Sequence, residues 1–363
     1  MFTTDYTQIL ELVANINPEQ YGKTRNYLNG AVTKLSPYIS RGVISTKQVA
    51  SSILAKGYQP HEVESLLKEL AWRDYFQQVW MALGEGINTD IKKLQPHQNK
   101  GIPKQLVDAD TGIIAIDQGI EQLYQTGYMH NHLRMYVASL ACNVAQSHWQ
   151  LPAKWMYYHL LDADWASNAL SWQWVAGSFS AKKYYANQEN INKYCGTEQT
   201  NTFLDASYEK LMGTDLSKNL PATASLPLTT TLPQFTSVVL EEHLPTYVYN
   251  FYNLDPTWDN HVKANRVLLL EPQFFDTYPV KDSTIAFVLE LAKNIPGIQV
   301  YTGSFSALFN HYDTQKINYK QHPTNNHYQG IMHSRDWMFP SVTGYYHSFF
   351  AYWKKASAYL NQL

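Results

Sequence analysis

Residues 161–174 read LDADWASNALSWQW, and this stretch decides how the rest of the chain is interpreted. Within it, two carboxylates, one amide and two indoles stand out as candidates for chemistry: Asp162, Asp164, Asn168, Trp172 and Trp174. Paired carboxylates can carry out acid–base chemistry, bind a cation, or accept hydrogen bonds from a ligand. Taken alone, the stretch also fits ordinary structure, because Asp caps helices and Trp fills cores.

A second segment, residues 126–135, reads TGYMHNHLRM. Asn131 and Met135 are four residues apart, so on a helix they share one face. Arg134 lies in a mostly apolar helical pattern, where an unpaired guanidinium would be costly. The sequence therefore predicts a carboxylate partner for Arg134, either Asp162 or Asp164.

Two further segments carry polar groups at helical or turn spacing. ELAWR at 69–73 places Glu69 and Arg73 at i and i+4, a pattern typical of a salt-bridged helix surface. YGKTR at 21–25 and TKLSP at 33–37 supply hydroxyls before a proline. Such hydroxyls can cap a helix or hold a phosphate.

The apolar spacing predicts helices over 62–83, from about 113 to Gly127, and over 130–149. Prolines punctuate residues 219–237, which predicts a linker. Beyond it, short apolar runs at 266–271, 298–302 and 316–319, with a helical pattern over 283–293, predict a small parallel α/β unit. The expected fold is α+β and multidomain: an all-α domain at 1–218, the linker 219–237, and a small α/β domain with a short parallel sheet at 238–363.

Composition excludes several classes of protein. The 363 residues are 45% hydrophobic and 16% charged, which is ample for packed cores. A net charge of −2 means that a nucleic-acid partner must be held by a local patch. Two cysteines cannot form a disulfide framework or ligate an iron–sulfur cluster, and the irregularly spaced C-terminal histidines do not predict a metal site. The sequence has no membrane-spanning run and no signal peptide, so we expect a cytoplasmic protein without a membrane partner.

Together, in this order and spacing, the four segments resemble the FAD-binding helical domain of the photolyase and cryptochrome family, over roughly residues 20–195. The resemblance implies FAD as the cofactor. It also implies the FAD-binding residues, which are Tyr21, Thr33, Lys34, Leu35, Ser36, Arg134, Asp162, Ala163, Asp164 and Asn168. Among them, Arg134 would pair with Asp162, and Asn168 would face flavin N5, where an amide favours the reduced ring.

The resemblance further implies a pocket for a flipped pyrimidine dimer, lined by the catalytic residues Glu69, Trp72, Asn131, Met135 and Trp174. Arg25, Arg73 and His132 match DNA contacts, and Trp172 and Trp149 match the inner two members of an electron-transfer chain. The implied activity is that of a deoxyribodipyrimidine photolyase, a carbon–carbon lyase in which excited FADH⁻ donates an electron to a cyclobutane dimer. Asn131 and Met135 stand where enzymes for (6-4) photoproducts carry histidines, which favours cyclobutane dimers.

The sequence departs from the family pattern in three respects. The outer tryptophan of the electron-transfer chain is replaced by Pro96, so the chain must end at another aromatic, such as Trp155 or a tyrosine. Tyr128 and His132 replace the usual tryptophan and arginine. Only about twenty residues precede the flavin motifs here, so we expect the α/β domain that usually comes before them to be absent, and the α/β unit that follows them to be either a relocated counterpart or unrelated.

Three functions are weighed from these observations. The leading hypothesis is a repair enzyme for UV-damaged DNA. The weak net charge favours single-stranded DNA as its substrate, and double-stranded DNA is kept as a second option. The alternative is a cryptochrome-like blue-light sensor that binds FAD without repair. The third is a nucleic-acid-binding helical protein without flavin, which the flavin-facing residues argue against.

Overall fold

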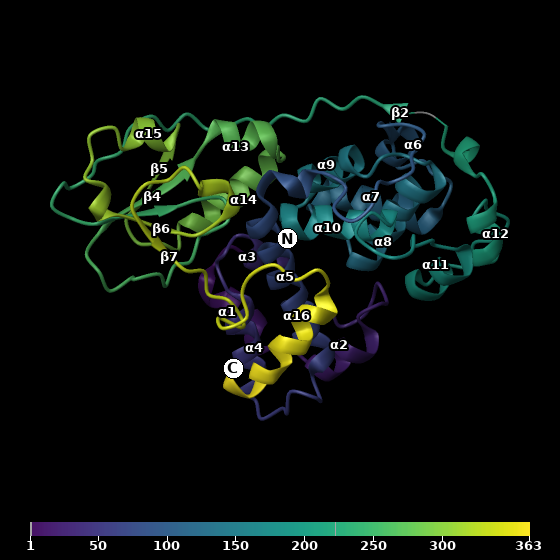
Figure 1. Ribbon diagram of the computed structural model, residues 1–363, viewed down its shortest axis with the longest axis horizontal. Coiled ribbons are helices and arrows are strands. Elements are labelled where there is room, and N and C mark those ends of the chain that lie inside the picture. The colour runs from purple at the N-terminus through teal and green to yellow at the C-terminus, as the bar shows by residue number, and fades with distance from the viewer. Residues whose placement is uncertain (1, 222) are drawn as a thin grey trace. The chain divides into compact units, whose positions relative to one another are not determined.

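The computed structural model describes residues 2–221 and 223–363, shown in Figure 1. Met1 and Ala222 lie outside the described residues, and Ala222 falls in the predicted linker. The chain folds into two compact units. The first unit comprises Met1–Pro18, Thr33–Ala82 and Thr229–Leu363, and the second comprises Glu19–Val32 and Leu83–Leu228. This division differs from the sequence-based one, which assigned all of residues 1–218 to one domain.

The helices of the first unit come from both ends of the chain. Before its sheet the chain forms α1 (Tyr6–Ala14), α3 (Ser36–Ser40), α4 (Thr46–Leu54) and α5 (Glu64–Leu83). Between the strands of the sheet it forms α13 (Pro272–Thr277), α14 (Asp282–Ala292) and α15 (Phe305–Leu308), and after the last strand it forms α16 (Phe349–Ala356). Short 3-10 turns lie at Thr314–Lys316, Pro323–Asn325 and Ser357–Gln362.

The sheet of the first unit is fully parallel and has the strand order β5-β4-β3-β6-β7 (Figure 1). Its strands are β3 (Thr246–Tyr249), β4 (Asn265–Leu270), β5 (Ile298–Thr302), β6 (Ile317–Lys320) and β7 (Ile331–His333). The predicted parallel sheet is therefore confirmed, although β3 and β7 were not predicted. Every residue of β3 and β4 is buried, as expected for central strands covered on both faces.

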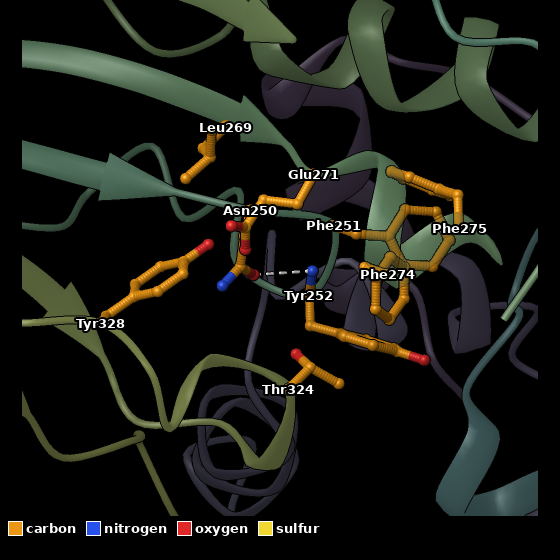
Figure 2. A pocket seen from close by; sticks show the side chains of 9 residues that line it. All are labelled: Asn250, Phe251, Tyr252, Leu269, Glu271, Phe274, Phe275, Thr324 and Tyr328. Atoms are coloured by element: carbon orange, nitrogen blue, oxygen red, sulfur yellow. Dashed lines mark hydrogen bonds between the residues drawn. The ribbon is translucent and has the colours of Figure 1, made fainter. Parts of the chain in front are cut away.

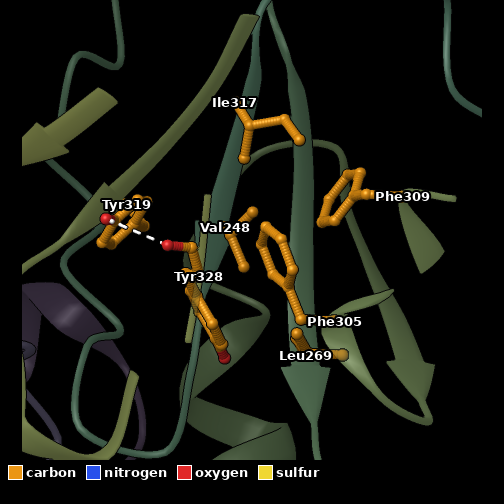
Figure 3. Close-up of a cluster of buried hydrophobic side chains, with 7 residues drawn as sticks. All are labelled: Val248, Leu269, Phe305, Phe309, Ile317, Tyr319 and Tyr328. Atoms are coloured by element: carbon orange, nitrogen blue, oxygen red, sulfur yellow. Dashed lines mark hydrogen bonds between the residues drawn. The ribbon is translucent and has the colours of Figure 1, made fainter. Parts of the chain in front are cut away.

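A hydrophobic cluster covers one part of this sheet (Figure 3). Its members come from three strands, from α15 and the residue that caps it, and from the loop after β6: Val248, Leu269, Phe305, Phe309, Ile317, Tyr319 and Tyr328. The rings of Phe305 and Tyr328 stack with centroids 4.4 Å apart. This packing fixes the ends of β3, β4 and β6 relative to one another, because interiors are close-packed.

The second unit is mostly helical. Its helices are α2 (Pro18–Thr24), α6 (Lys104–Val107), α7 (Ile114–Thr126), α8 (Asn131–Ser139), α9 (Gln150–His159), α10 (Trp165–Ala176), α11 (Gln188–Cys195) and α12 (Tyr208–Gly213). Short turns lie at Gly84–Asn88 and Ser217–Asn219, and β1 (Ile102–Pro103) pairs antiparallel with β2 (Thr223–Ala224). Among the described residues, no helix combines the length and hydropathy needed to cross a membrane.

The predicted helix over 130–149 is wrong in its extent. Regular α8 ends at Ser139, a π-helical turn follows over Leu140–Val144, and Gln146 has a φ of +55°. A left-handed backbone angle ends any right-handed helix, so Trp149 starts a new one as the N-cap of α9. The predictions over 62–83 and from 113 to Gly127 correspond to α5 and α7, whose C-terminal end is the left-handed Gly127.

Asp74 on α5 is a buried carboxyl that joins three parts of the first unit. It accepts hydrogen bonds from the Thr46 hydroxyl at 2.8 Å and from the Met338 backbone N–H at 2.7 Å. Burial raises the pKa of Asp74 to about 6, and the two hydrogen bonds only partly offset that increase. The folded protein therefore holds a proton that the unfolded chain releases near pH 4.

We expect the stability of the protein to fall between about pH 4 and pH 6 by about 3 kcal/mol through this group, at 1.36 kcal/mol per pKa unit. The contribution is present below the unfolded pKa and lost as the pH rises through the folded one. Urea unfolding of the protein and of Asp74→Asn across this range measures it, because the amide does not titrate. Parallel stability curves for the two proteins would contradict the prediction.

Candidate functional site

Four predicted flavin-facing residues of the second unit are held by α8, α10 and the turn before α10. Arg134 of α8 forms an ion pair with Asp162, with Nη2 at 3.0 Å from Oδ1 and 3.1 Å from Oδ2. Its Nε also donates to the Met129 carbonyl at 2.8 Å. Of the two carboxylates that the sequence left open, Asp162 is thus the one that pairs with Arg134.

Asp164 and Asn168 are positioned by the start of α10. Asp164 is its N-cap and accepts a hydrogen bond from the Ser167 backbone N–H at 2.7 Å. Asn168 lies one turn later and donates from Nδ2 to the Ala153 carbonyl at 2.8 Å. That bond orients the amide, because only its NH2 group can donate, so Oδ1 is left as the acceptor. Ala163, between the carboxylates, is fully buried.

This donor set fits the polar edge of an isoalloxazine ring, which alternates N–H and C=O groups. It offers a guanidinium, two carboxylates and an oriented amide, and Asp162, Asp164 and Asn168 are each less than a tenth exposed. Tyr128 is close to the set, with the Arg134 guanidinium 6.0 Å from its ring, and burial raises the pKa of its hydroxyl. The remaining predicted FAD residues lie elsewhere in the chain.

Tyr21 belongs to the second unit, whereas Thr33, Lys34, Leu35 and Ser36 belong to the first. The Thr33 hydroxyl accepts a 3.4 Å hydrogen bond from the Leu35 N–H, and Lys34 adopts a left-handed φ of +53°. Ser36 begins α3, and Leu35 is buried. The phosphate-binding role of these residues remains a prediction.

The residues predicted to line the dimer pocket are likewise divided between the two units. Glu69, Trp72 and Arg73 lie on α5 of the first unit, where Arg73 donates to the Ser40 hydroxyl at 2.7 Å. In the second unit, Asn131 is the first residue of α8 and is exposed, Met135 is half-buried, and Trp174 of α10 is 39% exposed. An indole kept this accessible is available for stacking on a flat ligand.

The predicted DNA contacts Arg25 and His132 lie among aromatic rings. The Arg25 guanidinium is 6.0 Å from the Tyr21 ring. His132 contacts the rings of Tyr136 and Tyr194, both at 4.7 Å, and its Nδ1 is 2.8 Å from the Asn26 carbonyl oxygen. Burial lowers the pKa of His132, so it is neutral at physiological pH. A neutral imidazole is a weaker phosphate ligand than the arginine expected at this position.

The two predicted electron-transfer residues, Trp149 and Trp172, are buried. The indole N–H of Trp149 donates to Asp90 at 2.7 Å, and its ring lies 6.4 Å from the ring of Trp165. Neither Trp165 nor Asp90 was predicted as a site residue, although Trp165 lies within the stretch 161–174. Trp155, named there as a possible end of the chain, donates to the Tyr124 hydroxyl at 3.1 Å.

The first unit has a pocket of its own at the carboxyl ends of β3 and β4 (Figure 2). It has a volume of about 280 Å³, including the part open to solvent, and an aromatic wall formed by Phe251, Tyr252, Phe274 and Phe275. Asn250 and Glu271, the residues directly after the two strands, provide its polar groups. This pocket was not predicted from the sequence, because β3, whose carboxyl end forms part of it, was not predicted either.

The pocket lies where the strand order reverses, since β3 pairs with β4 on one side and with β6 on the other. Open α/β sheets bind ligands at such points. The Glu271 carboxylate is already engaged: it accepts a hydrogen bond from the Phe305 N–H at 2.9 Å and lies 3.0 Å from His327 Nε2.

Comparison with known proteins identifies the helical region. Residues 66–206 match the family model described as the FAD binding domain of DNA photolyase. A deoxyribodipyrimidine photo-lyase from Alkalihalophilus pseudofirmus is 32% identical over 148 residues, which cover 40% of this chain and 31% of that protein. A chloroplastic/mitochondrial cryptochrome DASH from Ostreococcus tauri is 33% identical over 184 residues, covering 48% of this chain and 33% of that protein.

Among solved structures, a Synechocystis cryptochrome superposes with a TM-score of 0.49 at 25% identity, covering 53% of this chain and 44% of the other. The match to the family model shows that the chain carries a photolyase-type FAD-binding domain, and FAD is its cofactor. Over this domain the chain is similar to photolyases and to DASH cryptochromes. It spans about a third of the length of these curated relatives. Tyr21, Arg25 and residues 33–36 lie outside the matched segment.

Gly127 connects the two central motifs of this domain. It has a φ of +69°, and its carbonyl accepts a 2.9 Å hydrogen bond from the Leu161 N–H. A Cβ at this position would lie 2.6 Å from Leu161 Cγ. Gly196 ends α11 with a nearly identical φ of +70°, but there a Cβ would meet nothing within 4 Å.

We expect Gly196→Ala to cost about 1 kcal/mol of unfolding free energy, the strain of a left-handed alanine. Gly127→Ala should cost more, because Leu161 must also move and will displace the Asp162 turn. Urea unfolding of both variants measures the difference, and FAD retained after purification reports the displacement. Equal costs for the two substitutions would show that the close approach to Leu161 is unimportant.

Proposed function

We infer that this protein is a light-dependent DNA-repair flavoprotein that splits cyclobutane pyrimidine dimers, with single-stranded DNA as the favoured substrate. Relatives named deoxyribodipyrimidine photo-lyase support the reaction class. The retained set of Glu69, Trp72, Asn131, Met135 and Trp174 supports repair over light sensing, because a sensor does not need a dimer pocket.

The single observation that carries the proposal is the exposure of Trp174 on α10. This helix begins with Asp164, continues with Asn168 and presents the Trp174 indole 39% exposed, near Tyr184 at 6.0 Å. One rigid helix therefore carries both flavin-facing groups and an accessible stacking surface. Rigid elements position functional groups more accurately than loops do.

When bound, reduced FAD supplies the electron that light transfers to the dimer. The protein's own contribution is to bind and orient. Asn168 presents its Oδ1 acceptor, which matches the N5–H donor of reduced flavin and not the bare N5 of the oxidised ring. Trp72 and Trp174 would stack on the extruded bases, and Glu69 would accept hydrogen bonds from their edges.

A direct test illuminates the protein with blue light in the presence of a reductant and a short oligonucleotide carrying one thymine dimer. We expect light-dependent loss of the dimer, reduced at least tenfold in Glu69→Gln and in Trp174→Ala, because each removes a contact to the flipped bases. Chromatography of the oligonucleotide measures dimer content, and single- and double-stranded substrates compared side by side give the strand preference.

Leu94→Ala is the matched control, because Leu94 is an 84% exposed apolar residue outside the predicted site. Its repair rate should equal that of the unmodified protein. Bound flavin that responds to light, without any loss of dimer, would overturn repair and favour the light-sensor alternative.

The role of Asn168 predicts a change in flavin redox potential. Asn168→Ala removes one acceptor for the reduced ring, worth about 1.4 kcal/mol, so the two-electron midpoint potential should fall by about 30 mV. Equilibration with a reference dye measures this shift without any DNA. An unchanged potential would mean that Asn168 does not face N5.

A further inference from the structure

Helix α16 packs its inner face onto α5, the helix that carries Glu69 and Trp72. Phe349, Tyr352 and Trp353 are buried, and the Phe349 ring stacks on the Trp72 indole with centroids 3.8 Å apart and planes 10° apart. Trp353 stacks in turn on Phe349, at 6.0 Å and 18°. One face of the Trp72 indole is therefore covered by the protein itself.

The segment leading to α16 is fixed along α5 by successive hydrogen bonds. Met338 N–H donates to Asp74, Gln78 Nε2 donates to the Val342 carbonyl at 2.9 Å, and the Tyr75 hydroxyl donates to the Tyr346 carbonyl at 3.1 Å. Contacts at three successive points set the position of α16 relative to Trp72. The side chains on the outer face of α16 are therefore held at a fixed position relative to Trp72.

That outer face combines an aromatic ring with positive charge. Phe350 is 74% exposed, and Lys354 follows it at i+4, with Lys355 adjacent. Neither lysine forms an ion pair with any described residue. Tyr345, just before the helix, is 47% exposed. A lone exposed Phe would be unremarkable, but an exposed ring with two uncompensated cations is the combination that binds single-stranded nucleic acid.

We propose that the outer face of α16, formed by Phe350, Lys354 and Lys355, binds the DNA strand that flanks the damaged site. The inference rests on the proposed function, because it takes the site next to Trp72 as the place of the flipped dimer. Phe350 stacks on a flanking base, and the two lysines neutralise phosphates of the same strand. Charge selects the partner: the face is cationic, and a single strand offers both bases and phosphates.

The test measures binding in the dark by fluorescence anisotropy, with a 12-nucleotide single strand that either carries a thymine dimer or is undamaged. We expect Phe350→Ala to weaken binding of both strands by roughly tenfold, the usual effect of losing one stacked base, and Phe350→Trp to restore it. The Lys354→Ala/Lys355→Ala double variant should reduce the slope of log affinity against log salt by about 1.4, or 0.7 per phosphate.

Controls match each substitution by exposure. Val239→Ala removes an 81% exposed apolar side chain, and Lys293→Ala removes an exposed lysine of the same unit. Both should leave affinity and salt slope unchanged. Because Phe350 and the lysines are exposed, the variants should keep the thermal stability of the unmodified protein.

Trp72→Ala separates this inference from the proposed function. If Trp72→Ala abolishes the preference for the damaged strand while the α16 variants leave affinity and salt slope unchanged, the α16 inference is overturned and the repair proposal stands. If the protein shows no preference for damage and Trp72→Ala changes nothing, the repair proposal fails. If Phe350→Ala instead converts a dimer to a monomer in sedimentation without affecting DNA binding, the face is a self-association surface and the inference is overturned.

Discussion

The ion pair between Arg134 and Asp162 is the interaction on which the flavin-binding unit depends. It joins α8 to the turn before α10, two segments 28 residues apart that carry residues predicted to face the flavin. The Asp162 carboxylate is almost fully buried, so its charge would be strongly destabilising without the guanidinium. The pair therefore permits a charged, hydrogen-bonding surface inside a helical core, and the Gly127–Leu161 contact brings the same two segments to the correct separation.

Much of the fold could be predicted from the sequence, because local patterns carry it. The periodicity of α5 and α7, the stop at Gly127, and the β-branched runs of β4 and β5 all depend on neighbours within a few residues. What was missed depends on tertiary context. β3 reads TYVY, a strand-favouring but only four-residue run without alternation, and its pairing with β4 and β6 defines it, while β7 is a three-residue, largely exposed edge strand. The π turn after α8 also contradicted an apolar pattern that continued through it.

The candidate site divides in the same way. The Arg134 partner was predictable in kind, because burial requires a carboxylate, but the choice between Asp162 and Asp164 needed coordinates. Asp164 instead caps α10. The orientation of the Asn168 amide was not predictable, since it is set by a single contact with Ala153 across two helices. The Phe349–Trp72 stack joins residues 277 positions apart, a separation at which no sequence periodicity gives information.

The contacts between α5 and residues 338–349 also have a consequence for how the protein acquires its structure. The hydrogen bonds that fix this segment to α5 span 264 to 271 residues. Closing a loop of that length costs conformational entropy, and no stabilising contact offsets this cost until both ends have met. During synthesis, α5 is made early. Trp72 and Asp74 then lack their contacts with Phe349 and Met338 until more than 250 further residues have been added. The contacts around Trp72 are thus among the last in the protein to form. Until then the apolar side chains of α5 that pack against residues 338–349 stay exposed, which favours aggregation of the nascent chain.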